Sequence, residues 1–466
     1  MKNYIIIIFG LMLLGCNQQS TKEDINYDKF KVNKTAKTPP MGWNSWDVFG
    51  TDVTEDEVKA MADYMAEHLK PFGYEYIVVD LGWYAPNATA VEHQYHQRNN
   101  AHPHQIIDGY GRLIPAPNRF PSCKNGFKPL ADYVHSKGLK FGIHVMRGIP
   151  IQAVEQNTPI KGSNFTAQDV FSYQDRCVFY SGMYSLKTNH PGAMQYYQSL
   201  LDLYAEWGVD FIKSDDMARY PKSQHLEEFI LFRKALENTG RPMTLSLSPG
   251  GGISIMDRGT VNQYADMFRI SGDFWDEWSD LKDMFSRCRN WQMYTGPGSW
   301  ADCDMIPLGI INIRAEHGIG ERKTLFTIDE QYTLMTLWSV FRSPLMLGMD
   351  LTRLDDFTLS LLTNKKVIEI NQHSTNNKEI YNQEGIIVWR ATSIDSTETY
   401  LAVFNTNDNE SIIDLNENLK DKYDFKDFNE FYDIWTADPI SYDDIKTISI
   451  EPHGAKYIVC KHVGSE

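Results

Sequence analysis

At 466 residues, the chain is long enough for two or three domains and for a large hydrophobic core. Hydrophobic residues make up 42% and charged residues 23%, which is typical of a globular enzyme. The formal net charge of −16 disfavours nucleic acid and anionic membrane surfaces as partners, because like charges repel, and it leaves neutral ligands open.

The first sixteen residues have the pattern of a bacterial lipoprotein signal peptide. Lys2 precedes an apolar stretch (5–14) of about ten residues, which is too short to span a bilayer and typical of a signal-peptide core. The stretch ends in Leu13-Leu14-Gly15-Cys16, which resembles a lipoprotein cleavage site. We therefore expect a cell-envelope protein held to the membrane only by a lipid on Cys16, or a secreted protein if that site is not used.

A polar segment separates the signal peptide from the first predicted strand. Residues 17–37 contain few large apolar side chains, so we expect them to form a tether.

Eight apolar runs follow between residues 41 and 350, and polar residues gather at their C-terminal ends. Several intervals between them have helical periodicity, namely Glu55–Leu69, Phe127–Ser136 and Ala193–Trp207. Strands that alternate with amphipathic helices predict a parallel sheet, and eight repeats predict a (β/α)8 TIM barrel, which we place at 38–372. The predicted strands are Met41–Trp46, Tyr76–Trp83, Leu139–Met146, Val209–Asp216, Met243–Pro249, Met267–Asp273, Pro297–Asp304 and Ser343–Asp350.

The interval from Arg147 to about Met194 is longer than an ordinary strand-to-helix connection. It follows the third predicted strand, and active sites of such barrels lie at the carboxyl ends of the strands. We therefore expect it to carry loops that wall the active site.

From residue 373 onward the pattern changes to short alternating runs separated by turn residues. Long helical stretches are missing, which is typical of an antiparallel β-sandwich, and we assign this domain to 373–466. The predicted strands are Gly385–Ala391, Thr399–Phe404, Ser411–Leu415, Phe431–Trp435, Thr447–Ile450 and Ala455–Cys460.

Five cysteines remain after Cys16, and they are widely spaced without a CxxC pair. Such a set does not make a disulfide framework, so we expect mostly buried free thiols and at most one bridge. No cluster of His, Cys and Asp has the spacing of zinc ligands. We expect neither a metal nor another cofactor.

Two carboxylates, Asp215 and Asp273, end the fourth and the sixth predicted strands of the barrel. On parallel strands of one barrel they would project into the same mouth. Two facing carboxylates are the equipment that glycosidic bond cleavage needs. The sequence pattern therefore predicts a barrel with a pair of acids at its rim, the minimum that cleavage of a glycosidic bond requires.

Three motifs carry a resemblance to a known family. Thr38–Trp46, Trp207–Asp216 and Gly296–Met305 together resemble glycoside hydrolase family 27, which contains α-galactosidases and α-N-acetylgalactosaminidases. Ser343–Met346 and Val367–Gln372 are similar to the junction between barrel and sandwich in that family. The resemblance implies a retaining hydrolase that works by double displacement through a covalent glycosyl-enzyme.

The resemblance also divides the roles of the two carboxylates. The family's Lys-aromatic-Asp motif falls on Lys213-Ser214-Asp215, which implies that Asp215 is the nucleophile, although Ser214 departs from the aromatic residue. Arg269 and Asp273 match an Arg-x-x-x-Asp motif, which implies that Asp273 is the acid/base. Asp216, next in the chain, is the rival for the nucleophile and would face the other way on a strand.

Further positions match residues that hold the sugar in the family. Trp46 and Asp80 match residues that line the galactose ring, and Lys213 and Arg269 match hydrogen-bond donors. His144 replaces a family tyrosine at the end of the third predicted strand, and we expect it to contact either the sugar or the protein interior.

Two departures from the family pattern bear on which sugar is bound. Most members carry a pair of acids where this chain reads Asp80-Leu81, so one acceptor for the O4/O6 edge of the sugar is lost. Members that cleave galactosides tend to have Glu where this chain has Ser248, and a smaller side chain there admits a 2-acetamido group.

The sequence leads us to expect an exo-acting α-galactosidase with an oligosaccharide or glycan substrate. Ser248 and Gly251 favour an α-N-acetylgalactosaminidase instead, and Leu81 favours a β-L-arabinopyranosidase, since that sugar is galactose without its C6 hydroxymethyl group. A surface glycan-binding lipoprotein on an inactive scaffold is the alternative of another class, and it predicts a missing carboxylate.

Overall fold

The computed structural model describes residues 32–88, 104–219, 223–315, 320–420 and 425–462. From Val32 onward these residues belong to one compact unit. The predicted signal peptide (1–16) and the predicted tether as far as residue 31 lie outside the described residues. No helix within the described ranges is long and apolar enough to cross a membrane.

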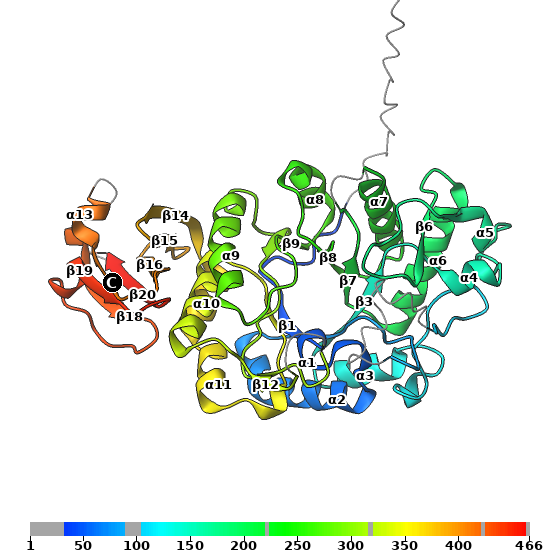
Figure 1. Ribbon diagram of the computed structural model, residues 1–466, viewed down its shortest axis with the longest axis horizontal. Coiled ribbons are helices and arrows are strands. Elements are labelled where there is room, and N and C mark those ends of the chain that lie inside the picture. Colours follow the sequence, from blue (N-terminus) through cyan, green and yellow to red (C-terminus); the bar gives the residue numbers. More distant parts are fainter. Residues whose placement is uncertain (1–31, 89–103, 220–222, 316–319, 421–424, 463–466) are drawn as a thin grey trace, which may run out of the picture. The chain divides into compact units, whose positions relative to one another are not determined.

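Eight parallel strands form the central sheet, and each of the eight predicted runs contributes one strand (Figure 1). The first seven strands pair in chain order, and the last strand pairs with the first. Ile306 closes the ring, because its N–H donates to Met346 O (2.8 Å) and its carbonyl accepts from Gly348 N–H (3.1 Å). The prediction of a (β/α)8 barrel is confirmed. Its strands are β1 (Met41–Asn44), β2 (Tyr76–Val79), β3 (Lys140–Met146), β7 (Phe211–Asp215), β8 (Thr244–Ser248), β9 (Met267–Arg269), β10 (Trp300–Asp302) and β13 (Leu345–Leu347).

Helices surround the strands (Figure 1). The predicted helix Glu55–Leu69 starts at a capping box between Thr54 and Glu57 and ends in a π-helical turn, Met65–Leu69. The helices that precede the sandwich and follow a barrel strand are α1 (Trp46–Phe49), α2 (Glu55–Tyr64), α3 (Lys128–Ser136), α6 (Pro191–Trp207), α7 (Ser223–Asn238), α8 (Arg258–Tyr264), α9 (Trp278–Trp291), α10 (Ile328–Phe341), α11 (Asp356–Leu362) and α12 (Lys365–His373). A short hairpin of β11 (Ile310–Ile311) and β12 (Arg322–Lys323) follows β10.

Large rings fill the barrel interior and require glycines opposite them. Tyr76 on β2 and Phe211 on β7 pack with ring centroids 5.1 Å apart. A Cβ on Gly142 of β3 would lie 2.9 Å from both Phe211 Cβ and Val78 Cγ2. A Cβ on Gly42 of β1 would lie 2.6 Å from Tyr76 Cβ. Because the barrel interior is packed with apolar side chains, the polar residues at the carboxyl ends of the strands form the bottom of the open end of the barrel.

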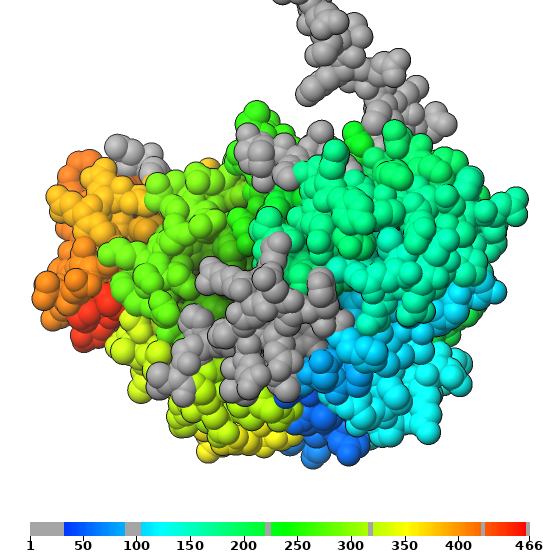
Figure 2. All heavy atoms as spheres, turned by 45° about the vertical axis from the view of Figure 1, so that its right-hand side comes forward, coloured from blue at the N-terminus to red at the C-terminus, as the bar shows by residue number. Residues whose placement is uncertain are grey.

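The long interval after β3 is a structured excursion. It contains β4 (Ile149–Pro150), α4 (Ile151–Glu155), α5 (Ala167–Val170), β5 (Phe171–Ser172) and β6 (Met183–Leu186), which form a three-stranded sheet and two short helices. In the space-filling view its atoms, in turquoise, form a continuous flank of the barrel (Figure 2). One aromatic residue of this interval, Phe179, lines a pocket at the carboxyl ends of the barrel strands.

The C-terminal part is an antiparallel β-sandwich, as predicted, and all six predicted strands are present. Its five-stranded sheet and its two-stranded sheet enclose an apolar core that includes Val388, Leu401 and Ile413. The sequence missed one edge strand, Thr375–Gln383, because its side chains are mostly polar and lack clear alternation. The elements are β14 (Thr375–Gln383), β15 (Ile386–Thr392), β16 (Glu398–Asn405), β17 (Ser411–Asp414), α13 (Leu415–Leu419), β18 (Phe428–Asp433), β19 (Thr447–Ile450) and β20 (Ala455–His462).

The last residues of the predicted tether (17–37) are attached to the barrel. Thr35 N–H donates to Asp266 Oδ1 (3.0 Å), and Arg233 Nη2 donates to Asn33 O (2.9 Å). The segment that leads into β1 is therefore held in place by ion-paired residues of α7 and the strand region before β9.

The five cysteines after Cys16 are buried free thiols, as predicted. Cys288 and Cys303 come nearest to each other, with 3.5 Å between their Sγ atoms.

Candidate active site

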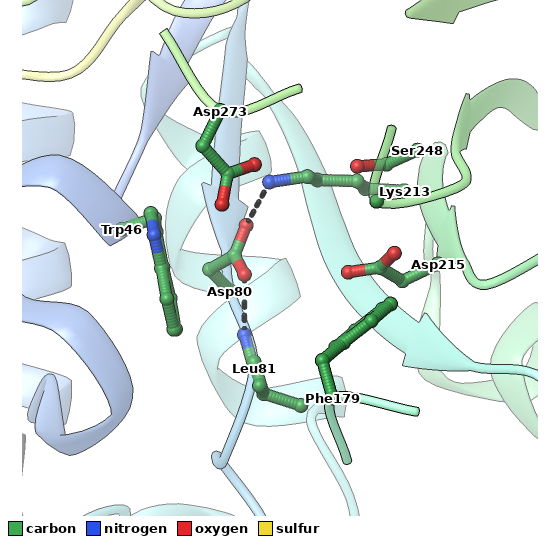
Figure 3. A pocket seen from close by; sticks show the side chains of 9 residues that line it. Trp46, Asp80, Leu81, Phe179, Lys213, Asp215, Ser248 and Asp273 are labelled. Atoms are coloured by element: carbon green, nitrogen blue, oxygen red, sulfur yellow. Dashed lines mark hydrogen bonds and ion pairs between the residues drawn. The ribbon is translucent and has the colours of Figure 1, made fainter. Parts of the chain in front are cut away.

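A pocket at the carboxyl ends of the barrel strands gathers most of the predicted site residues (Figure 3). Its space, including the open mouth, is about 600 Å³. Six of the eight predicted site residues line it, while His144 and Arg269 lie behind the lining residues. The lining residues are Trp46, Asp80, Leu81, Phe179, Lys213, Asp215, Ser248, Gly250 and Asp273.

Asp215 is the last residue of β7, and its carboxylate points into the pocket (Figure 3). Side chains alternate along a strand, so Lys213 and Asp215 share the inner face while Ser214 faces away from it. Ser214 is buried and its Oγ donates to Met217 Sδ (3.3 Å), so the departure at the middle of the family motif lies away from the pocket. Two donors hold the Asp215 carboxylate: Asp216 N–H to Oδ1 (2.8 Å) and His144 Nε2 to Oδ2 (3.0 Å).

Asp216, the rival for the nucleophile, belongs to a buried ion-pair network outside the pocket. Its Oδ2 accepts from Arg147 Nη2 (2.8 Å) and its Oδ1 from Arg219 Nη1 (3.3 Å), and Arg147 also pairs with Glu228 (2.7 Å). Burial raises the pKa of Asp216 to about 6, although Arg147 opposes that shift. Its φ of 58° turns the backbone so that its N–H reaches Asp215. The network therefore holds Asp216 outside the pocket while its N–H supports the carboxylate of Asp215.

Lys213 and Asp80 form a buried ion pair at the floor of the pocket (Figure 3). Asp80 Oδ2 accepts from Lys213 Nζ (2.8 Å) and from Asn44 Nδ2 (2.7 Å), and Oδ1 accepts from Leu81 N–H (2.7 Å). Burial alone would raise the pKa of Asp80, but the charge of Lys213 and these hydrogen bonds hold it below its usual range. Asp80 is therefore an ionised acceptor, and Lys213 a charged donor, beside the space for a ligand.

Asp273 lies on the loop after β9, and its side chain is 62% exposed. Arg269 joins it to the interior, because Nη2 is 3.2 Å from Asp273 Oδ1 and Nη1 is 2.8 Å from Asp304 Oδ1. Asp304 Oδ2 also accepts from Phe274 N–H (2.9 Å), the residue after Asp273. Asp304 thus fixes the loop that carries Asp273 at the pocket mouth.

Asp302 is a buried acid beside Asp304, and we expect its titration to be visible in the stability of the protein. Burial and the neighbouring Asp304 raise the pKa of Asp302 to about 7. Asp302→Asn keeps the Oδ1 acceptor for Asp304 N–H (2.9 Å) and removes the titration. Because the folded-state pKa lies above that of the unfolded chain, the wild type loses stability relative to D302N as the pH rises from about 4 to about 7, by about 1–4 kcal/mol.

Denaturation of both proteins at pH 4, 5.5, 7 and 8 measures this difference. The exposed Asp438 provides the matched control, since D438N removes a carboxylate from the surface of the sandwich. A stability difference between D302N and wild type that stays constant across this range would show that Asp302 does not titrate there.

The pocket wall opposite Lys213 is apolar. Leu81 and Phe179 both line the pocket here (Figure 3), and Leu81 is only 7% exposed. Ser248 ends β8 beside Asp215 in the strand register, and it lines the pocket from a buried position. Trp46, the first residue of α1, forms the wall across from Asp215 (Figure 3).

Sequence reasoning missed Phe179 and Asn44 as site residues. Phe179 comes from the excursion after β3, where no periodic pattern indicated which residue would reach the barrel mouth. Its ring packs over Gly250, where a Cβ would lie 2.6 Å from Phe179 Cε1. Asn44 on β1 could have been found, because it belongs to the matched Thr38–Trp46 motif and alternates to the inner face with Gly42.

The described residues contain no group of three or more His, Cys, Asp or Glu side chains placed to hold a metal ion. The chemistry open to this pocket from the groups that line it is acid–base and nucleophilic catalysis by carboxylates next to a pair of fixed charges.

Comparison with known proteins agrees with this geometry. Residues 38–154 and 151–373 match the family described as alpha galactosidase A. A crystal structure of a glycoside hydrolase family 27 β-L-arabinopyranosidase from Geobacillus stearothermophilus is 43% identical, with a TM-score of 0.85, and the match covers 92% of this chain and 98% of that one. The alpha-galactosidase of Cyamopsis tetragonoloba is 28% identical over 425 residues, 85% of this chain and 85% of its own length. The alpha-N-acetylgalactosaminidase of Gallus gallus is 28% identical over 359 residues, 73% of this chain and 71% of its own. The chain belongs to the alpha galactosidase A family, glycoside hydrolase family 27, and is a glycoside hydrolase.

Proposed function

We propose that this protein is a retaining exo-glycosidase that removes terminal β-L-arabinopyranose, and α-galactose more slowly, from oligosaccharides. The observation that carries this choice of sugar is Leu81, a buried apolar residue in the pocket wall where the family resemblance puts an acceptor for the sugar's O4/O6 edge. The proposed lipid on Cys16 would hold the enzyme at the bacterial cell envelope.

The proposed reaction has two steps. Asp273 protonates the leaving oxygen while Asp215 attacks the anomeric carbon, which gives a glycosyl ester on Asp215 and releases the aglycone. Asp273 then takes a proton from water, the water oxygen bonds to the anomeric carbon, and the ester bond breaks. Both carboxylates line one pocket, and Asp273 is exposed at its mouth, where an aglycone would leave.

The choice of sugar follows from what the hydroxymethyl group of a hexose would meet. Asp80 already accepts three hydrogen bonds from protein groups, and neither Leu81 nor the Phe179 ring can accept one. A C6 hydroxyl against these side chains would lose its water without a replacement acceptor. A pentopyranose lacks that group, so an apolar wall disfavours galactose by roughly 10–100-fold.

Galactose is the second candidate, because the curated relatives include alpha-galactosidases and because the Lys213–Asp80 pair is compatible with either sugar. N-acetylgalactosamine is the third, since Ser248 leaves space beside Asp215.

The specificity of the wild type and of Leu81→Asp tests the proposal. We expect the wild-type kcat/KM for 4-nitrophenyl β-L-arabinopyranoside to exceed that for the α-galactoside by about 10-fold or more. L81D, which restores an acceptor, should narrow or reverse this ratio, and L81I, which keeps the wall apolar, should preserve it. A wild type that prefers the α-galactoside or the α-N-acetylgalactosaminide would overturn the proposed sugar and leave the proposed mechanism intact.

A further inference from the structure

His144 lies on β3 between two carboxylates of the site. Its Nε2 is 3.0 Å from Asp215 Oδ2 and 3.9 Å from Asp80 Oδ1. The parallel register pairs His144 with Lys213, so both side chains face the barrel interior at one level. The imidazole is fully buried and is not among the residues that line the pocket, so its contact is with Asp215 and not with the space for the sugar.

The surroundings of the ring decide which nitrogen carries the proton. Nδ1 is buried and has no hydrogen-bond partner among the residues that the structure describes. A proton on Nδ1 would therefore be an unsatisfied buried donor, whereas a proton on Nε2 points at a carboxylate oxygen. We assign the N–H to Nε2, so that His144 is the donor and Asp215 the acceptor.

We infer that His144 is a positioning residue, which holds the carboxylate of Asp215 through Nε2–H and stabilises the negative charge that returns to it when the glycosyl-enzyme is hydrolysed. This inference rests on the proposed function, in which Asp215 is the nucleophile. Of the two contacts expected from the sequence, with the sugar or with the protein interior, the inference takes the second.

The hydrogen bond from His144 to Asp215 favours the second step of the reaction and not the first. In the first step Asp215 loses its negative charge as it bonds to the anomeric carbon, so a donor to the free carboxylate does not help the attack. In the second step the bond between the anomeric carbon and the Asp215 oxygen breaks, and its electron pair returns to the carboxylate. The water oxygen bonds to the anomeric carbon, and its proton goes to Asp273. A donor already placed at Oδ2 stabilises the charge that forms in this step.

Loss of the donor therefore predicts a particular kinetic signature. If only the second step slows, the glycosyl-enzyme accumulates, so that kcat and KM fall together while kcat/KM changes little. A residue that contacts the sugar would raise KM instead, and a residue that only fills space would change the melting temperature without creating a burst.

His144→Phe removes the donor and keeps a flat ring of similar size. Since Nδ1 has no partner in the described chain, the hydrogen bond to Asp215 is the only one that the carbon ring gives up, together with the longer approach of Nε2 to Asp80 (3.9 Å). His144→Gln is the conservative variant, because its amide restores an N–H donor. With a 2,4-dinitrophenyl glycoside, whose leaving group makes the first step fast, we expect H144F to show a burst of dinitrophenol and a kcat about 10–100-fold lower, with KM lowered by a similar factor. H144Q should stay within about 5-fold of the wild type in both constants.

Three outcomes would overturn the inference: H144F that raises KM at unchanged kcat, H144F without a burst at wild-type kcat, or equal losses in H144F and H144Q. If H144F does not fold, H144M replaces it, because methionine also lacks an N–H donor. The melting temperature of each variant shows whether it is folded. Asp215→Ala in the same assay distinguishes a failure of the proposed function from a failure of the proposed role of His144. Full activity of D215A would contradict the proposed function. An inactive D215A together with wild-type kinetics of H144F would contradict only the proposed role of His144.

Discussion

Asp215→Ala is expected to lower kcat/KM for nitrophenyl glycosides by about 10⁴-fold or more, because it removes the proposed nucleophile and with it the proposed covalent intermediate. Asp215 ends β7 with its carboxylate in the pocket and with donors on both oxygens, so its loss leaves no other carboxylate at that position in the described pocket. Steady-state kinetics with the arabinopyranoside and the galactoside measure the effect.

Addition of azide to D215A tests whether the lost carboxylate acts as a nucleophile. In D215A, azide can occupy the space of the lost carboxylate and attack the anomeric carbon, so activity should return and the product should be a glycosyl azide of inverted configuration. Asp216→Asn is the matched control, since it removes the neighbouring carboxylate that binds Arg147 outside the pocket. D216N should keep turnover within about 10-fold of the wild type, whereas an inactive but folded D216N beside an active D215A would transfer the role of nucleophile to Asp216.

Asp273→Ala is expected to have an effect that depends on the leaving group. A dinitrophenyl group leaves without protonation, so the first step should be nearly normal and the second, which needs a base, should slow by about 10²–10⁴-fold. For an unactivated disaccharide, the first step should also lose its acid. Kinetics with both substrates measure the difference, and azide should accelerate release from the dinitrophenyl glycoside and give a glycosyl azide of retained configuration. Equal losses with good and poor leaving groups would contradict the assignment of Asp273 as the acid/base.

The fold could be predicted in detail because its pattern is repetitive. Each of the eight apolar runs became a strand of the barrel, since buried parallel strands are continuous hydrophobic runs that end in polar residues at one edge. The edge strand Thr375–Gln383 was missed because half-exposed polar residues leave no period to detect. Its pairing with β15 comes from backbone hydrogen bonds, which any residue except proline can make.

The site could be predicted where its residues end strands, and not where tertiary contacts place them. Asp80, Lys213 and Asp215 follow from alternation on predicted strands together with the family resemblance. Phe179 reaches the pocket from an excursion whose path no local pattern specifies. The role of His144 likewise depends on a distance between β3 and β7 that a sequence does not contain.

The stereochemistry of the first-formed product tests the central claim most directly. When ¹H NMR follows the hydrolysis of 4-nitrophenyl β-L-arabinopyranoside from its first minutes, the account predicts that β-L-arabinopyranose appears first and then mutarotates, because two displacements at one carbon restore its configuration. If the α anomer appears first, hydrolysis is a single displacement by water and the glycosyl ester on Asp215 does not form.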